Sequence, residues 1–274
     1  MWEDSQSQLA GFAGVQSMGQ RRWARDELLV TFSLYCRTPF GRLHRLNPDV
    51  LRLAHSLRRT PDAVAMKLCN FAGLDPAQQA RNIRGLANAS AADRAIFDEF
   101  NSDWEGLAYE SELAVERIGM PSSQAPVDNA DPSTGYVGVT EAERSVRVRT
   151  AQAFFRRTVM VSYSFTCAVC EITVPCLLQA SHIIPWSMDE SRRADPRNGI
   201  ALCALHDRMF DRGLMTFDEQ LHVLLSGQLR TDDPCRMHIV AINEIEGAAL
   251  HLPHRFLPDT EALRFHRYHI FLPG

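Results

Sequence analysis

The chain has 274 residues, of which 45% are hydrophobic and 23% are charged, and its formal net charge is -4 at pH 7. This length is sufficient for two ordinary domain cores, and no apolar run approaches the roughly 20 residues that cross a bilayer, which excludes a membrane-spanning protein. The seven cysteines are odd in number, and no charged start followed by an apolar run marks a signal peptide, so we expect a soluble protein of the reducing cytoplasm that does not contact a membrane.

The net charge hides an uneven distribution along the chain. Residues 21–100 hold 13 Lys and Arg against 8 Asp and Glu, whereas residues 101–142 hold 1 against 8. A basic segment beside an acidic one is typical of a protein whose first part contacts nucleic acid. Every cation of the basic segment except Lys67 is an arginine, which suits phosphate binding, although a GC-rich genome produces the same bias.

Composition divides the chain into four parts. Residues 1–19 are rich in Gln, Ser and Gly and are expected to form a flexible N-terminus, and residues 20–118 form a first domain. Residues 119–142 contain few apolar residues and several helix breakers, which predicts an acidic linker. Residues 143–274 form a second domain.

The first domain is predicted to be mainly helical. Apolar residues recur at helical spacing over 25–36, 49–57 and 63–71, and Thr60 followed by Pro61 is a typical start of the third helix. The second and third helices with their short connector resemble a helix-turn-helix. On the third helix Lys67 and Asn70 would face DNA, with Arg59 just before it, although any amphipathic helix places polar residues on one side.

The loop over residues 35–45 is a candidate DNA-binding pocket. It combines aromatic residues, a proline and several cations, which would give apolar walls and a charged rim suited to a modified backbone or base. The candidate contacts are Tyr35, Arg37, Pro39, Phe40, His44 and Arg45. In the alternative interpretation, Tyr35, Pro39 and Phe40 close the domain core while the arginines face solvent.

The second domain is predicted to contain a helix, two strands and a second helix, so the whole chain belongs to the α+β class. The first helix covers 146–163, the strands cover 177–182 and 199–202, and the second helix covers 205–210. A further strand pair is expected at 214–217 and 221–225. Arg156, Arg157 and Arg208 would face solvent or a phosphate backbone. The histidines of the terminal segment, His251, His254, His266 and His269, have no ligand spacing and are expected at the surface.

Three residues of the second domain form an ordered series. His182 lies in Ser-His-Ile-Ile-Pro-Trp, Asn198 follows 16 residues later, and His206 comes 8 residues after that, in Leu-His-Asp-Arg-Met-Phe-Asp. A neutral imidazole and one divalent cation can activate water, neutralise a phosphate and assist the leaving oxygen in phosphodiester cleavage. Over residues 145–226 this pattern resembles the HNH family of ββα-metal nucleases.

The resemblance implies roles for these residues. His182 would be the general base, Asn198 would orient that base or touch the metal, and His206 would be a ligand of Mg²⁺, Mn²⁺, Co²⁺ or Ni²⁺. Ser181 stands where many family members carry Asp or His as a further metal ligand. Because a hydroxyl is a poor ligand for a hard cation, we expect fewer protein ligands around the metal. Asp211 is interpreted as a helix-end residue or a neighbour of the ligands in preference to a ligand.

Three cysteines near the motif raise the question of structural zinc. Cys167, Cys170 and Cys203 occupy places where many HNH proteins carry two CxxC knuckles. The second knuckle is interpreted as broken, with Leu205 in the place of its last ligand, so that a site would need Cys176 or a distant histidine. We therefore expect buried, metal-free cysteines.

The first domain is similar to the sulfur-binding domain of two-domain HNH restriction enzymes, which recognises phosphorothioate DNA. The similarity lies in Leu34-Tyr-Cys-Arg-Thr-Pro-Phe-Gly-Arg-Leu-His, in the run from Arg59 to Pro76 and in Gly85-Leu-Ala-Asn-Ala-Ser. It implies a restriction endonuclease that cuts modified double-stranded DNA, with a homodimer plausible because two strands must be cut. Two alternatives remain, namely a relatively unspecific nuclease controlled by a partner or a signal, and an inactive DNA-binding regulator.

Overall fold

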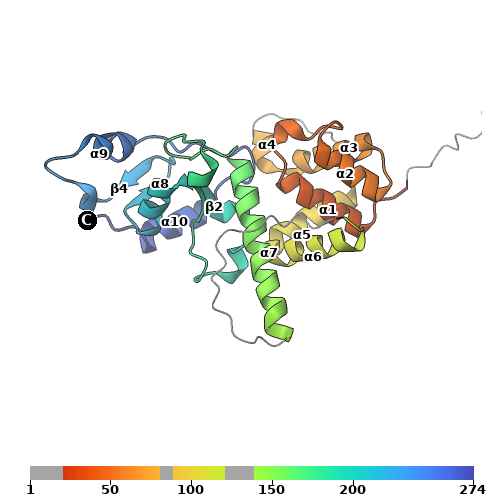
Figure 1. The fold of residues 1–274 in the computed structure, drawn as a ribbon. Coiled ribbons are helices and arrows are strands. Elements are labelled where there is room, and N and C mark those ends of the chain that lie inside the picture. Colours follow the sequence, from red (N-terminus) through yellow and green to blue (C-terminus); the bar gives the residue numbers. More distant parts are fainter. Residues whose placement is uncertain (1–20, 81–88, 121–138) are drawn as a thin grey trace, which may run out of the picture.

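The computed structural model describes residues 21–80, 89–120 and 139–274, and in these residues the protein has an α+β fold (Figure 1). A helical part from the first half of the chain lies on one side, a mixed part of helices and short strands lies on the other, and a long helix stands between them. The expected flexible N-terminus and most of the expected linker lie outside the described residues. None of the helices in the described ranges has both the length and the apolar composition of a membrane span.

The helical part consists of six α-helices and a short 3₁₀ turn in the described residues. They are α1 (Arg25–Cys36), η1 (Phe40–Arg42), α2 (Pro48–Leu57), α3 (Pro61–Leu74), α4 (Pro76–Ala80), α5 (Ala91–Ser102) and α6 (Trp104–Arg117). The Thr60 hydroxyl accepts a hydrogen bond of 3.2 Å from the Ala63 amide, which caps α3. The first three α-helices begin within two residues of their expected starts because their signals, a cap followed by proline and an apolar period, are local.

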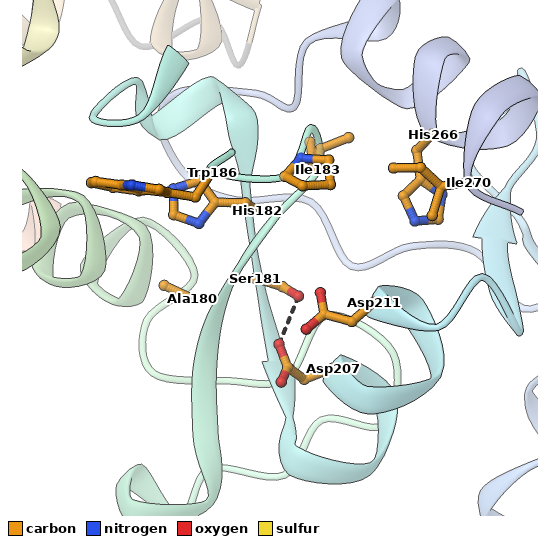
Figure 2. Close-up of a pocket in the computed structure, with 10 residues that line it drawn as sticks. Ala180, Ser181, His182, Ile183, Trp186, Asp207, Asp211, His266 and Ile270 are labelled. Carbon is orange, nitrogen blue, oxygen red and sulfur yellow. Dashed lines mark hydrogen bonds between the residues drawn. The ribbon is translucent and has the colours of Figure 1, made fainter. Parts of the chain in front are cut away.

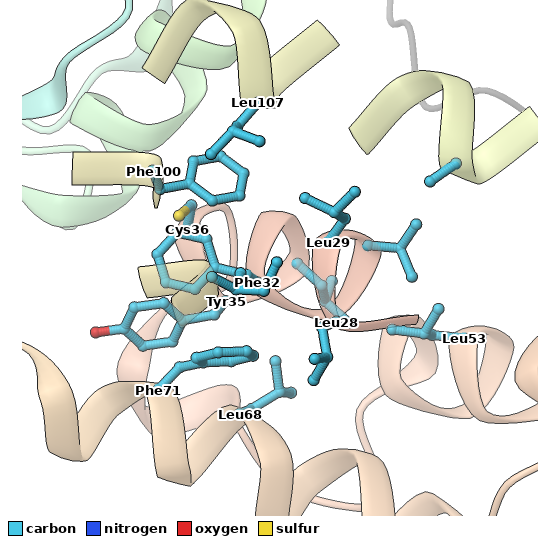
Figure 3. Close-up of a cluster of buried hydrophobic side chains, with 14 of the residues drawn as sticks. Leu28, Leu29, Phe32, Tyr35, Cys36, Leu53, Leu68, Phe71, Phe100 and Leu107 are labelled. Carbon is cyan, nitrogen blue, oxygen red and sulfur yellow. The ribbon is translucent and has the colours of Figure 1, made fainter. Parts of the chain in front are cut away.

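Helix α1 is the centre of the helical part. Ten of its twelve residues are buried, so other helices cover it on all sides. Phe32 lies at the middle of this core, with its ring centroid 4.9 Å from that of Phe71 and 4.5 Å from that of Phe100 (Figure 3). Tyr35 is also fully buried here, and its hydroxyl donates to the Asp75 carboxylate at 3.0 Å.

The long helix α7 (Val139–Ser162) contacts both parts of the protein. Ala151 is buried in the core of the helical part, and Phe154 packs against that core. Phe155 and Val159 belong instead to the second hydrophobic core. This helix therefore packs into the core of the mixed part on one side and into that of the helical part on the other.

The mixed part begins with two antiparallel strands and a helix. Strand β1 (Leu178–His182) pairs with β2 (Gly199–Cys203) so that His182 lies opposite Gly199, and α8 (Ala204–Asp211) follows β2 without a loop. A second pair is formed by β3 (Met215–Phe217) and β4 (Val223–Leu225). The remaining elements are η2 (Pro175–Leu177), η3 (Glu190–Arg192), η4 (Pro196–Asn198), η5 (Gly227–Leu229), α9 (Arg236–Ala241), η6 (Asn243–Ile245) and α10 (Thr260–His269).

The chain returns to the helical part just before α10. The guanidinium of Arg255 is buried and donates to the backbone carbonyls of Tyr35 and Thr38, the latter at 2.6 Å. The neighbouring Phe256 ring packs edge-on against Trp104 at 5.4 Å and belongs to the helical core. The two parts are therefore joined by buried contacts and not only by the chain.

Candidate functional site

His182 ends β1 and is held in one orientation. Its ring stacks on that of Phe155, with centroids 3.8 Å apart and planes at 9°, and Trp186 packs edge-on at 5.5 Å. Its Nε2 lies 3.0 Å from the backbone carbonyl oxygen of Arg193. Since a carbonyl can only accept, this contact places the proton on Nε2 and leaves the lone pair on Nδ1.

The environment of His182 also keeps its ring neutral. Burial lowers the pKa of this imidazole below its usual value, and this effect outweighs the hydrogen bond to Arg193, which acts in the opposite direction. A neutral ring with one free lone pair is able to take a proton from water near pH 7.

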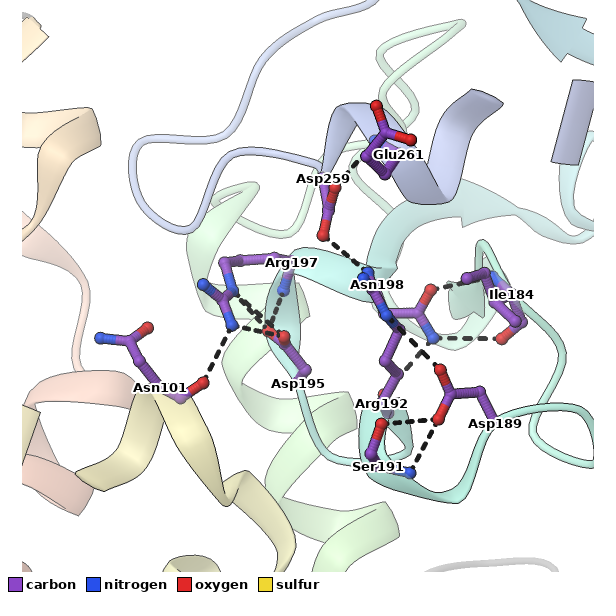
Figure 4. Close-up of polar contacts among 10 residues, drawn as sticks. All are labelled: Asn101, Ile184, Asp189, Ser191, Arg192, Asp195, Arg197, Asn198, Asp259 and Glu261. Atoms are coloured by element: carbon purple, nitrogen blue, oxygen red, sulfur yellow. Dashed lines mark hydrogen bonds and ion pairs between the residues drawn. The ribbon is translucent and has the colours of Figure 1, made fainter. Parts of the chain in front are cut away.

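Asn198 is buried and holds the loop that follows β1. Its Oδ1 accepts from the Ile184 amide at 2.8 Å, and its Nδ2 donates to the carbonyls of Ile184 at 3.1 Å and Arg192 at 3.3 Å (Figure 4). It is only 1% exposed and does not line the pocket beside His182. The structure thus uses Asn198 to hold the loop that follows β1, and Asn198 does not reach the pocket.

A pocket of about 350 Å³ lies beside His182. Ser181, Asp207 and Asp211 line it, and the two carboxylates extend from α8 toward β1 (Figure 2). The Ser181 hydroxyl donates to Asp207 Oδ1 at 2.7 Å. Burial raises the pKa of both carboxyl groups, and the negative charge of Asp207 raises that of Asp211 further. Two carboxyl groups with raised pKa that line one pocket form a favourable place for a divalent cation.

His206 does not reach this pocket, in contrast to its expected role as a ligand of the catalytic ion. It is 1% exposed, and its Nδ1 lies 3.3 Å from the sulfur of Cys203 and 3.6 Å from that of Cys167. With Cys170 these residues form a cluster in which one ligand atom from each lies within 4.8 Å of the others. In a CxxC knuckle that begins at Cys203, the last position is occupied by His206 and not by Leu205. His206 is therefore the fourth side chain of the cluster, which appeared to be missing.

The chemistry of this cluster fits a tetrahedral zinc ion. Three sulfur atoms and one imidazole nitrogen are a common ligand set for structural zinc. The Nε2 of His206 lies 3.1 Å from the Ala241 carbonyl, which fixes the proton there and turns Nδ1 toward the sulfur atoms, as an outer hydrogen bond does for a ligating histidine. Hydrogen bonds from Cys167 and Cys170 lower the pKa of the Cys203 thiol and favour its thiolate form.

Several residues expected to contact DNA are instead buried in the helical part. Tyr35 belongs to the core, as the alternative interpretation of its loop required. The Nζ of Lys67 pairs with Asp93 at 2.7 Å, and Arg59 pairs with Glu27 at 2.8 Å. Asn70 is also buried. Arg59 lies in the connector before α3 and is partly buried, whereas Lys67 and Asn70 are buried on α3 itself, so the third helix does not present Lys67 and Asn70 to a partner.

The other expected DNA contacts are accessible to different degrees. Arg37, Pro39 and Phe40 are half-buried, and Phe40 packs against the helical core. The accessible candidates are His44, Arg45, Arg156, Arg157 and Arg208. Arg156 and Arg208 both lower the pKa of Asp207, so their positive charges act on the pocket beside His182.

Sequence interpretation missed Asp207 and Gly199 as residues that shape the site, and it placed Asp211 at the helix end or beside the ligands before counting it as a ligand. Asp207 and Asp211 are four residues apart on α8 and so share a helix face, a signal that was present in the sequence. Gly199 carried no such signal. A Cβ atom at this position would lie 2.8 Å from the Phe155 ring and 2.5 Å from Val159, so only glycine lets α7 approach β2 closely.

Comparison with known families agrees with this geometry. A family model described as HNH endonuclease matches residues 167–218, which contain the cysteine and histidine cluster, β1, the loop with Asn198, β2 and α8. No curated protein matches the chain. The neutral histidine at the end of β1, the buried asparagine and the acidic pocket lie together within the matched residues. The protein therefore carries an HNH endonuclease domain and is a nuclease, a phosphodiester hydrolase.

Proposed function

We propose that this protein is a metal-dependent DNA endonuclease of restriction type that cuts modified double-stranded DNA, with phosphorothioate DNA as the preferred target. The observation that carries the nuclease chemistry is the pocket that joins neutral His182 to two carboxylates. The proposed target depends on the resemblance of the first domain to sulfur-binding domains.

His182 acts as the general base in this proposal. Its Nδ1 accepts a proton from the water that attacks the phosphorus atom, while the Arg193 carbonyl stabilises the positive charge that then develops on the ring. Phe155 and Trp186 exclude other orientations of the imidazole. The catalytic residue is therefore ready before DNA binds.

Asp207 and Asp211 would hold the divalent cation, with Ser181 at its edge. Hard cations such as Mg²⁺ prefer oxygen ligands, and this pocket offers two carboxylates and a hydroxyl. When bound, the cation neutralises charge on the scissile phosphate and assists the leaving oxygen. In this assignment Asp207, and not His206, is the ligand of the catalytic cation from the start of α8.

Exposed arginines would hold the DNA backbone around the pocket. Arg208 lies on α8 and Arg156 donates to the side chain of Gln179 on β1, so the two cations come from the elements that bear the site. Guanidinium groups bind phosphate oxygens with paired hydrogen bonds. His44 and Arg45 are the exposed remainder of the candidate contacts in the helical part.

A second candidate function is a nuclease that does not depend on DNA modification and is controlled through its helical part. The burial of Tyr35, Lys67 and Asn70 favours this candidate, because it removes three of the expected DNA contacts. The buried contacts of Arg255 with the helical part would then be a route by which that part affects the nuclease.

Plasmid cleavage separates these candidates. The protein is incubated with Mg²⁺, Mn²⁺, Co²⁺ or Ni²⁺ and with otherwise identical plasmids that carry or lack phosphorothioate linkages. We expect cleavage of the modified plasmid alone, and none with EDTA. Equal cleavage of both plasmids would favour the second candidate, and absence of cleavage with all four metals would leave the inactive regulator.

Two variants test the assigned chemistry. His182→Ala is expected to abolish cleavage while DNA binding persists, and Asp207→Asn is expected to raise the metal concentration needed for half-maximal activity. Glu219→Gln, an exposed acid away from the pocket, is the control and should behave as the unmodified protein. Full activity of His182→Ala would show that another group is the base.

We also propose that Cys167, Cys170, Cys203 and His206 bind one structural zinc ion. This ion would tie the segment before β1 to the junction of β2 and α8. Elemental analysis of purified protein should give about one zinc per chain, and Cys170→Ser should lower both the zinc content and the melting temperature. Cys176→Ser is a matched control because Cys176 is exposed and outside the cluster. Zinc-free protein of unchanged stability would refute the assignment.

A further inference from the structure

The loop between β1 and β2 provides the contact that selects the tautomer of His182. The carbonyl of Arg193 accepts from His182 Nε2, and it directly follows the short turn η3. The preceding carbonyl, that of Arg192, accepts from Asn198 Nδ2 and from the Asp195 amide, each at 3.3 Å. The direction of the Arg193 carbonyl therefore depends on how firmly η3 is held.

An ion pair fastens η3 to the start of α10. Nη1 of Arg192 lies 2.6 Å from Oδ2 of Asp259, and the two side chains are 28% and 26% exposed (Figure 4). Asp259 is itself well anchored, because it caps α10 by accepting from the Glu261 amide at 2.8 Å and its own amide donates to the Arg197 carbonyl at 2.9 Å. A short, charge-assisted and largely buried contact restrains geometry more than an exposed pair does.

We propose that Arg192 and Asp259 are positioning residues for phosphodiester hydrolysis, because their ion pair holds the Arg193 carbonyl against Nε2 of His182. This inference rests on the proposed role of His182 as the general base. Arg192 and Asp259 do not line the pocket, so they act through the backbone of the loop.

The physical consequence concerns the proton on the imidazole ring. Without the ion pair, the loop keeps the two 3.3 Å hydrogen bonds to the Arg192 carbonyl. The Arg193 side chain also keeps its contacts with the Trp186 carbonyl at 2.9 Å and with Glu190 at 3.0 Å. The side-chain attachment of η3 to α10 is lost, however, so the direction of the Arg193 carbonyl is less tightly restrained. The ring then also populates the tautomer with the proton on Nδ1, which cannot accept a proton from water at that atom. The rate of the chemical step falls, while the surface that binds DNA is unchanged.

The test uses single and double variants of the full-length protein. Asp259→Asn removes the charge but keeps a good helix cap, and Arg192→Gln removes the other charge. We expect kcat to fall on the order of tenfold in each, with KM for DNA and the melting temperature unchanged, and the double variant to be no slower than either single one. Glu261→Gln is the matched control, since it removes an exposed pair with Arg264 at 3.7 Å on the same helix.

A spectroscopic measurement reports the tautomer directly. In protein labelled with ¹⁵N-histidine, the His182 signals are identified by their loss in His182→Ala. They should show protonated Nε2 in the unmodified protein and a mixture of tautomers in Asp259→Asn.

The inference would be overturned by kcat values equal to that of Glu261→Gln, by additive losses in the double variant, or by an unchanged tautomer. A rise in KM with constant kcat would also overturn it, because Arg192 would then be a DNA contact. Failure of the proposed general base is distinguishable from these outcomes, because His182→Ala would then remain active.

Discussion

At the scale of single residues, His266 is a buried histidine with both ring nitrogens engaged by other groups of the protein. Its ring stacks on Phe210 with centroids 3.7 Å apart, its Nε2 lies 3.1 Å from the Phe210 carbonyl, and its Nδ1 lies 3.0 Å from the Thr216 hydroxyl. The expectation that the terminal histidines are surface residues is wrong for this one, which is 1% exposed. It links α10 to α8 and β3.

The burial of His266 predicts a specific dependence of stability on pH. Desolvation lowers its pKa from 6.5 to about 4, against the opposing effect of the hydrogen bond to Phe210. As the pH falls below 6.5, the unfolded chain binds a proton at this residue that the folded protein does not bind until about pH 4. Its contribution to stability is therefore full above pH 6.5 and is lost between pH 6.5 and 4, by about 3 kcal/mol.

Urea unfolding at pH 7, 6 and 5 measures this effect. We expect His266→Gln to be less stable than the unmodified protein at pH 7 but to lose less stability on acidification. His251→Gln changes an exposed histidine and should keep the original pH dependence. Parallel pH profiles for His266→Gln and the unmodified protein would show that His266 is protonated equally in both states.

At the scale of elements, the close packing of α7 on β2 predicts that Gly199→Ala damages the active site. The added methyl group would press on Val159 and on Phe155, whose ring also stacks on that of His182. Overpacking of this kind costs about 1–3 kcal/mol. We expect a lower melting temperature and a larger fall in kcat than in DNA affinity, measured by cleavage kinetics and a binding assay.

A matched glycine variant isolates this effect. Gly41→Ala adds the same methyl group where nothing lies within 4 Å, so it should change neither the melting temperature nor kcat. Adding Phe155→Leu to Gly199→Ala should recover part of the stability, because it relieves the contact with the ring while that with Val159 stays, but it should not recover activity, because the ring that supports His182 is gone. Normal kcat in the double variant would contradict the supporting role of Phe155.

The elements also show what the sequence alone could predict. The ranges of α1, β1, β2 and α8 agree with expectation to within one residue, because apolar period and helix signals are local properties. The partner of Lys67 could not be predicted, because Asp93 lies 26 residues away and helix packing decides which faces meet. The candidate site was only partly predictable. His182 followed from its motif, whereas the position of His206 beside three cysteine sulfur atoms is a result of folding.

At the scale of the whole molecule, the helical and nuclease parts share a core through Arg255 and Phe256. The Phe256 backbone has φ of 51°, which is unfavourable for a residue with a side chain, and the burial of its ring against Trp104 offsets that cost. The Arg255 guanidinium donates to the Tyr35 carbonyl at the end of α1. It also lies over the Tyr35 ring, with its central carbon 4.7 Å from the ring centroid. Neither part completes its packing alone.

This shared core predicts that the two parts unfold together. Replacing Arg255 by Met leaves the Thr38 carbonyl buried without its donor, at about 1–3 kcal/mol, and takes one donor from the Tyr35 carbonyl, which keeps the Thr38 amide at 3.4 Å. Phe256→Ala removes a buried ring at about 3–5 kcal/mol. In calorimetry we expect one transition for the unmodified protein and two for the Arg255→Met/Phe256→Ala double variant. Leu257→Ala, next in the chain but 39% exposed, should keep a single transition.

The same double variant shows whether the connection matters for cleavage. The segment from Arg255 leads directly into Asp259, which holds η3, so loosening it should weaken the restraint on the Arg193 carbonyl as well. We expect cleavage to fall at temperatures below the first transition, while DNA binding by the folded helical part persists. Unchanged cleavage in a protein with two separate transitions would mean that the helical part contributes DNA binding alone, and that the geometry of the nuclease site is maintained entirely by its own core.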